Sequence, residues 1–165
     1  MMACVAVALL LSGAGAAAVA SGVPAASRTV ALQQARFAVP DGCAFECSLA
    51  TDVYHGELRC GKWPAVSYYA GLGVRPAFEP DSRAVHGRHR MQDTTAYWGR
   101  SDKASDPPQA YCAVLTFPAT WADPRADFYH QLCTTSRDRR LHDLLRRFVL
   151  SYAPATEEPA CERGR

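Results

Sequence analysis

The cysteines are the feature that most constrains how this chain can fold. The sequence has seven of them, and one, Cys4, lies within an uncharged apolar stretch at the N-terminus. The other six are Cys43, Cys47, Cys60, Cys112, Cys133 and Cys161. An even number of cysteines in an exported chain indicates a disulfide framework, which stabilises a small domain by restricting its unfolded state. Six cysteines allow many pairings, and the sequence does not select one of them.

Residues 1–20 have the composition of a secretory signal peptide. They carry no charged side chain, and an apolar core is followed by small residues. The small-x-small pattern ending at Ala20 predicts cleavage after that residue and a flexible new N-terminus at residues 21–29; a pattern ending at Ala18 is the alternative. A membrane anchor is the other interpretation of this stretch. We favour secretion or a periplasmic location, with no membrane span in the mature chain, because the apolar run is short and interrupted by glycines.

Length and composition indicate a single domain at residues 30–152, followed by a C-terminal tail at residues 153–165. The chain has 165 residues and a hydrophobic content of 48%, which suffices for one core. Its 18 basic and 16 acidic residues nearly balance, so the composition does not call for a nucleic acid or an anionic membrane as partner. Cys43 and Cys47 have a loosely zinc-like spacing, but no second pair matches it, and disulfides remain the favoured interpretation.

The first two thirds of the domain favour strands. Turn residues bound short apolar or alternating segments, and Pro40-Asp41-Gly42 is typical of a β-turn. The run at residues 110–117 is apolar almost throughout, which predicts a central strand. The other expected strands cover residues 30–39, 57–60 and 65–70, with a polar hairpin or pair of edge strands at residues 85–97.

The last third favours helices. Within residues 135–152, Leu141, Leu144, Leu145 and Phe148 form the stripe of a helix that packs by one face, with Thr135 as its cap. An earlier helix is predicted to begin at Asp123-Pro124, with Phe128, Leu132 and Cys133 facing inward. Strands followed by helices predict an α+β fold, in which an antiparallel sheet is covered by C-terminal helices and stabilised by disulfides.

Three short patches resemble Mog1/PsbP-like domains. Residues 37–42 (Phe-Ala-Val-Pro-Asp-Gly) look like the opening strand of that family, and residues 115–118 and 148–152 resemble its late strand and closing helix. The resemblance implies an α/β/α sandwich. It carries over no active-site residue, because the family shares no common catalytic residues. Better-known members act by binding other proteins, which favours a binding role; Cys43 departs from the family pattern, where an aromatic residue often follows the opening strand.

Basic and aromatic residues between positions 83 and 100 form the leading candidate site. Such a mixture can bind an anionic polymer or an acidic protein surface. Charges on an edge strand also protect a sheet from aggregation, which is the alternative interpretation. The candidate binding residues are Arg83, His86, Arg88, His89, Arg90, Tyr97 and Trp98, and Arg100 lies at the end of the same patch.

Histidines supply the candidate catalytic groups. His86 and His89 with Asp93 could share a divalent metal in a small secreted hydrolase, although neighbouring arginines would repel a cation. His55, in the loop expected before a short strand, is a second possibility for such an enzyme. We rank hydrolysis below binding, and we assign no catalytic residue, metal or cofactor.

A third candidate combines Asp127, His130 and Cys133, which are spaced three apart and would share one face of the predicted helix. A carboxylate, an imidazole and a thiol can form an activated nucleophile. A disulfide at Cys133 is the favoured interpretation.

Taken together, these patterns predict an exported accessory protein that binds another envelope or extracellular protein, or an anionic polymer, through residues 83–100.

Overall fold

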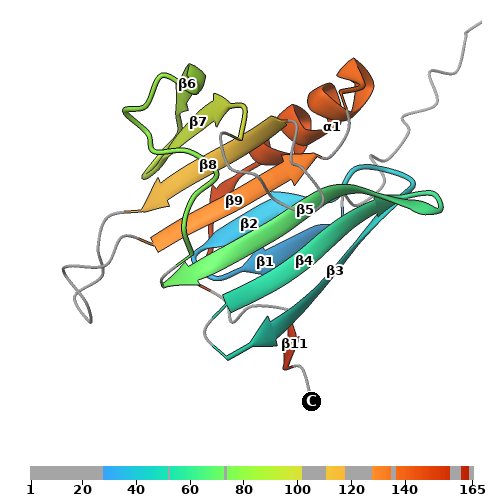
Figure 1. The fold of residues 1–165 in the computed structure, drawn as a ribbon. Helices are drawn as coiled ribbons and strands as arrows, with labels where there is room; N and C mark the ends of the chain where they lie inside the picture. The colour runs from blue at the N-terminus through green and yellow to red at the C-terminus, as the bar shows by residue number, and fades with distance from the viewer. Residues whose placement is uncertain are drawn as a thin grey trace, which may run out of the picture.

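The computed structural model shows two β-sheets and one helix in the part of the chain that it describes, which is residues 28–51, 53–72, 74–101, 111–117, 128–134, 137–156 and 161–163 (Figure 1). The helix is α1 (Arg139–Leu150). The strands are β1 (Thr29–Leu32), β2 (Ala35–Ala38), β3 (Cys43–Ala50), β4 (Val53–Cys60), β5 (Trp63–Leu72), β6 (Val85–Arg90), β7 (Thr95–Gly99), β8 (Tyr111–Phe117), β9 (Phe128–Thr134), β10 (Ala153–Pro154) and β11 (Glu162–Arg163). The predicted signal peptide lies outside the described residues.

The larger sheet has the strand order β11-β3-β4-β5-β9-β8-β7-β6, and the smaller one has the order β1-β2-β10. All neighbours pair antiparallel except β11, which runs parallel to β3. The β2–β3 connection is the predicted turn, since the backbone N–H of Cys43 donates to Pro40 at 3.0 Å and Gly42 has a φ of 74°. The predicted hairpin at residues 85–97 is also present as β6 and β7, although β7 extends to Gly99.

The predicted α+β fold with an antiparallel sheet covered by C-terminal helices, and the implied α/β/α sandwich, are wrong. Within the described ranges the fold is mostly β, with the single helix α1 on one face of the larger sheet. Strands β1 and β2 lie across the same face, where helices were expected (Figure 1), and β10 pairs with β2. The disulfide stabilisation expected with the fold is present.

The source of this error is the segment at residues 128–134, which forms β9 and not a helix. It pairs with β5 on one side and β8 on the other, and nearly all of its residues are buried. A strand covered on both faces lacks the polar–apolar alternation of an edge strand, so its pattern is easily mistaken for that of a buried helix. The predicted helix start at Asp123-Pro124 lies outside the described residues.

Helix α1 carries the apolar stripe that its sequence predicted. Leu144, Leu145, Phe148 and Val149 are buried, and Leu141 packs beside them partly buried. The N-cap is Asp138, whose carboxylate accepts from the backbone N–H of Arg140 at 2.9 Å. The expected cap, Thr135, lies outside the described residues.

The main core lies between the larger sheet and the layer formed by α1 and the smaller sheet. Phe148 of α1 is the centre of an aromatic cluster, with its ring 5.1 Å from that of Phe37 in β2 and 5.8 Å from that of Phe45 in β3. Tyr68 of β5 extends the cluster, with its ring 5.7 Å from Phe45. Burial of such large rings supplies most of the stabilisation of a small domain.

The opposite face of the larger sheet is covered in part by the segment at residues 74–84, between β5 and β6. Phe78 of this segment is 1% exposed and packs in a second cluster with Val114 of β8 and the disulfide-bonded pair Cys112 and Cys133. Gly99 of β7 lies directly beneath the segment, since an added Cβ atom would meet the carbonyl oxygen of Ala84. The second cluster therefore holds this segment across β7, β8 and β9.

The six predicted cysteines form three disulfides, Cys43–Cys60, Cys47–Cys161 and Cys112–Cys133. The first and third join residues directly opposite each other on adjacent antiparallel strands. The second fastens the C-terminal segment to β3, where β11 pairs beside it. Membrane-spanning helices are absent from the described residues. The three disulfides are compatible with an extracellular or periplasmic protein.

Candidate functional site

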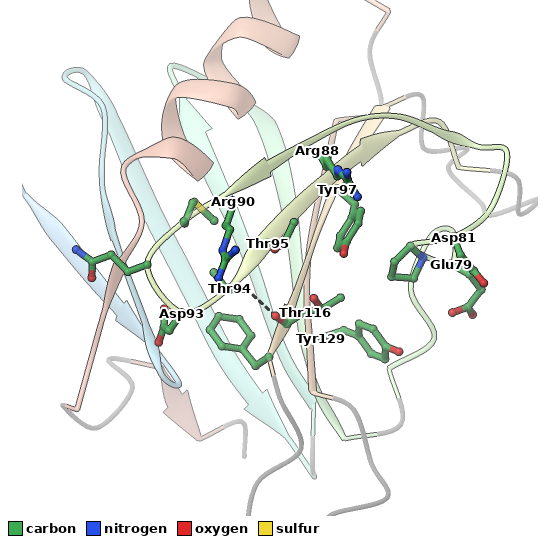
Figure 2. Close-up of a pocket in the computed structure, with 14 residues that line it drawn as sticks. Glu79, Asp81, Arg88, Arg90, Asp93, Thr94, Thr95, Tyr97, Thr116 and Tyr129 are labelled. Atoms are coloured by element: carbon green, nitrogen blue, oxygen red, sulfur yellow. Dashed lines mark hydrogen bonds between the residues drawn. The ribbon is translucent and has the colours of Figure 1, made fainter.

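A groove of about 1040 Å³ lies on the face of the larger sheet opposite α1 (Figure 2). Its floor consists of polar and aromatic side chains from β7, β8 and β9, and the segment before β6 supplies acidic residues. The lining residues are Glu79, Pro80, Asp81, Arg88, Arg90, Met91, Gln92, Asp93, Thr94, Thr95, Tyr97, Thr116, Phe117 and Tyr129.

Strand alternation directs two arginines of β6 toward this groove. Arg88 is opposite Tyr97 and Arg90 is opposite Thr95, and all four side chains line the groove. Both arginines are exposed, and Figure 2 shows Arg88 beside Tyr97 and Arg90 farther along the same strand. Their guanidinium groups are therefore available to an anionic group of a ligand.

Three hydrogen bonds hold the turn between β6 and β7. The backbone N–H of Met91 donates to Thr94 at 2.9 Å, and the Thr94 hydroxyl donates to the carbonyl of Thr116 in β8 at 2.6 Å (Figure 2). The Tyr152 hydroxyl, just after α1, donates to Asp93 at 2.6 Å. Burial and this bond to a carboxylate raise the pKa of Tyr152 above its ordinary value. The arginine-bearing hairpin is thus attached to the sheet and to the end of the helix.

Both signs of charge line the groove. Arg88 and Arg90 come from β6, whereas Glu79 and Asp81 come from the segment that crosses the sheet, and Figure 2 shows the two pairs in different parts of the groove. Tyr97 and Tyr129 contribute aromatic rings with hydroxyl groups. A surface of this composition suits a ligand with both charged and apolar groups, such as a polypeptide.

The other residues of the predicted patch lie elsewhere. His89 is opposite the buried Ala96, so its side chain points to the face of the sheet that α1 covers. Trp98 is 5% exposed on that same face, where the guanidinium of Arg146 lies 5.9 Å from its ring centre. The three remaining residues are exposed outside the lining of the groove: Arg83, His86 and Arg100.

The structure does not assemble the metal site suggested for His86, His89 and Asp93. Among the described residues, which include all three, no group of His, Cys, Asp or Glu side chains could hold a metal ion. The Asp93 carboxylate instead accepts a hydrogen bond from Tyr152. Nothing in this geometry supports metal-assisted hydrolysis at these residues.

His55 lies on β4, and not in a loop, and lines a smaller pocket of about 410 Å³ on the same face of the sheet. Its ring meets that of Tyr69 edge to face at 5.0 Å. The nearby carboxylate of Glu57 pairs with Arg59 at 2.5 Å, and the hydroxyl of Ser67 donates to a backbone carbonyl at 3.3 Å. The pocket therefore shows no nucleophile aligned with His55.

His130 and Cys133 do not form a nucleophile pair. Three positions apart on a strand, they point to opposite faces of the sheet, and the sulfur of Cys133 is bonded to Cys112. His130 is fully buried in the core, and its Nδ1 shares a hydrogen bond of 3.0 Å with the hydroxyl of Tyr68. Asp127 lies outside the described residues.

Sequence reasoning missed several groove residues, because they come from segments far apart in the chain. Glu79 and Asp81 belong to the proline-containing segment between β5 and β6, and Thr116 and Tyr129 belong to β8 and β9. The only sequence signal for Thr116 was its place as a polar residue at the end of an apolar strand. No pattern within one segment could place Glu79 in the same groove as Arg88, because that placement depends on the segment crossing the sheet.

The resemblance of the three sequence patches to Mog1/PsbP-like domains stays a prediction. Comparisons of this chain with protein-family models, with curated proteins and with solved structures found no match.

Proposed function

We propose that this is an exported binding protein that holds an acidic segment of another extracellular or periplasmic protein in its groove, through Arg88 and Arg90. The observation that carries the proposal is the placement of Arg88 and Arg90 on the same face of β6, where both side chains line the groove and Arg88 lies opposite Tyr97. The uncharged N-terminus supports export by a signal peptide cleaved after Ala20. The three disulfides support an oxidising destination.

The mixed charge of the groove favours a protein over a uniform polyanion. A polyphosphate or sulfated glycan long enough to cross the groove would meet Glu79, Asp81 and Asp93 as well as the arginines. Like charges at close range disfavour that occupant, whereas a polypeptide can place acidic residues near the arginines and basic or neutral residues elsewhere.

Replacing both arginines tests this proposal. Binding of a fluorescently labelled, glutamate-rich peptide is measured by anisotropy for the intact protein and for the Arg88→Ala/Arg90→Ala variant. Exposed charge pairs of this kind contribute about 0.5–1 kcal/mol each, so the dissociation constant should rise by about 5- to 30-fold. The melting temperature should barely change, since both side chains are exposed.

The matched control is Arg137→Ala/Arg139→Ala, which removes the same charge from exposed positions near the start of α1. This control should bind the peptide like the intact protein. Equal affinity of the two double variants would contradict the proposal. Tighter binding of polyphosphate or heparin than of the peptide, also lost with Arg88 and Arg90, would assign the groove to an anionic polymer and reject the protein partner.

A further inference from the structure

The two edges of the larger sheet differ in how they are covered. At one edge, β11 pairs with β3, and the Cys47–Cys161 disulfide holds it there. At the other edge, β6 pairs only with β7 among the strands that the structure describes. An uncovered edge presents backbone N–H and C=O groups that can bond to another extended chain.

The register identifies which backbone groups of β6 point outward. Met91 and Thr94 close the hairpin as a hydrogen-bonded pair, since the N–H of Met91 donates to Thr94 at 2.9 Å. Hydrogen-bonded and non-hydrogen-bonded pairs alternate along an antiparallel ladder. The pairs Arg90–Thr95 and Arg88–Tyr97 are therefore of the non-hydrogen-bonded kind, and the backbone groups of both arginines point away from β7.

The same two residues thus offer two kinds of contact. Their side chains point into the groove, and their backbone groups point outward at the edge of the sheet. We infer that β6 recognises its partner by strand addition, so that an extended acidic segment pairs with the backbone of Arg88 and Arg90 while its alternate side chains enter the groove. This inference rests on the proposed function and adds to it the conformation of the partner.

Charge selects the occupant of this edge. Two copies of this chain that paired antiparallel through β6 would bring Arg88 of each close to Arg88 or Arg90 of the other. Like charges directly opposite each other destabilise strand pairing, so the edge disfavours a second copy of the protein. An acidic strand has the complementary charge, and alternating acidic residues would all lie on the groove side.

A backbone-modified peptide tests the inference without altering the protein. The probe is a labelled peptide of about eight residues that alternates Thr and Glu, the length of an ordinary strand. Two comparison peptides have the same side chains but carry N-methyl groups on alternate backbone nitrogens. One is methylated at the odd-numbered positions and the other at the even-numbered positions. Loss of two main-chain hydrogen bonds should weaken binding about tenfold or more in one register only.

Hydrogen exchange of the protein's own amides supplies a second readout. Saturation with the unmodified peptide should slow exchange at Arg88 and Arg90, whose N–H groups point outward. The amides of Gly87 and His89, which face β7, are the internal control and should change little. A peptide that alternates Thr and Lys should neither bind nor protect any of these amides.

The possible failures are distinguishable. If the Thr-Glu peptide binds, and the Arg88→Ala/Arg90→Ala variant weakens it, but N-methylation has no effect and the two amides exchange as before, strand addition is wrong and the proposed function stands. If the arginine variant binds the peptide normally while N-methylation abolishes binding, the edge inference stands and the role of the side chains is wrong. Absence of binding by the unmodified peptide overturns strand addition by acidic segments.

Discussion

His130 is an uncharged imidazole enclosed by aromatic rings. Its ring lies 4.9 Å from Phe117 and 5.1 Å from Phe128, and its Nδ1 shares a hydrogen bond with the hydroxyl of Tyr68. Burial lowers the pKa of His130 to about 3, and the backbone of Gln33 opposes part of this shift. His130 is therefore a core residue, and not the catalytic residue that the sequence suggested as a possibility.

This histidine should make the protein sensitive to acid. In the unfolded chain its pKa is about 6.5, so below that pH the unfolded state binds a proton that the folded state excludes. The contribution of His130 to the free energy of unfolding should be fully present above pH 6.5. As the pH drops from there toward 3, the free energy of unfolding should fall by up to about 1.4 kcal/mol for each pH unit. Urea titrations between pH 8 and pH 5 measure the slope.

The control is the His130→Phe/Tyr68→Phe variant, which removes both hydrogen-bonding partners together. It should lack most of the decline between pH 6.5 and pH 5, before most carboxylates titrate. If the variant and the intact protein lose stability equally over that interval, His130 is not the residue responsible.

At the scale of the elements, the close packing of the segment at residues 74–84 against β7 depends on Gly99. A Cβ atom at Gly99 would meet the backbone oxygen of Ala84 and lie 3.0 Å from the ring of Phe78. We expect Gly99→Ala to reduce the free energy of unfolding by about 1–3 kcal/mol, because the segment must move away from the sheet. It should also alter peptide binding, since Glu79 and Asp81 belong to the displaced segment.

Gly87→Ala is the matched control for that change. Gly87 lies on the neighbouring strand, and nothing stands within 4 Å of a Cβ atom added there. Its stability should stay within about 0.5 kcal/mol of the intact protein. Chemical denaturation of the two variants, side by side, compares the same substitution with and without a steric conflict; equal stabilities would show that the segment does not rest on Gly99.

The disulfide at the covered edge should matter for self-association as well as stability. In Cys47→Ala/Cys161→Ala, β11 loses its attachment to β3 across a loop of 114 residues. The free energy of unfolding should fall by about 2–4 kcal/mol. Because the freed edge of β3 can pair with another chain, size-exclusion chromatography should show oligomers that grow with concentration.

Cys43→Ala/Cys60→Ala is the comparison variant, since it removes a disulfide closing a loop of 17 residues and leaves β11 attached. This variant should be less stable than the intact protein but should elute from the size-exclusion column at the same volume. Oligomers in both variants would indicate that lost stability, and not the uncovered edge, drives association.

At the scale of the whole molecule, local sequence patterns predicted local features correctly. They failed for features that depend on contacts between segments far apart in the chain. The stripe at Leu144, Leu145 and Phe148, the apolar strand β8, the β6–β7 hairpin and disulfide bonding all depend on short-range spacing or on composition, and all are present. The layer that covers the sheet was wrong, because β9 is buried on both faces and its spacing does not distinguish strand from helix.

The candidate site follows the same division. Arg88, Arg90 and Tyr97 were named from the sequence, because they lie within one basic and aromatic stretch. Strand alternation then separates them from His89 and Trp98, which a linear reading had grouped with them. The acidic side of the groove follows from the second hydrophobic cluster, which places residues 79–81 over the sheet and has no signature in any single segment.

The Cys47–Cys161 disulfide has a consequence for the order in which the disulfides form. Cys47 emerges from the ribosome between Cys43 and Cys60, which are each other's partners, whereas its own partner comes 114 residues later. Oxidation in order of appearance would join Cys47 to one of those neighbours. The native connectivity therefore requires that Cys47 remain a thiol until Cys161 is available, or that a wrong bond be exchanged afterwards by thiolate attack. Maturation of this protein should accordingly be faster where a disulfide isomerase is present.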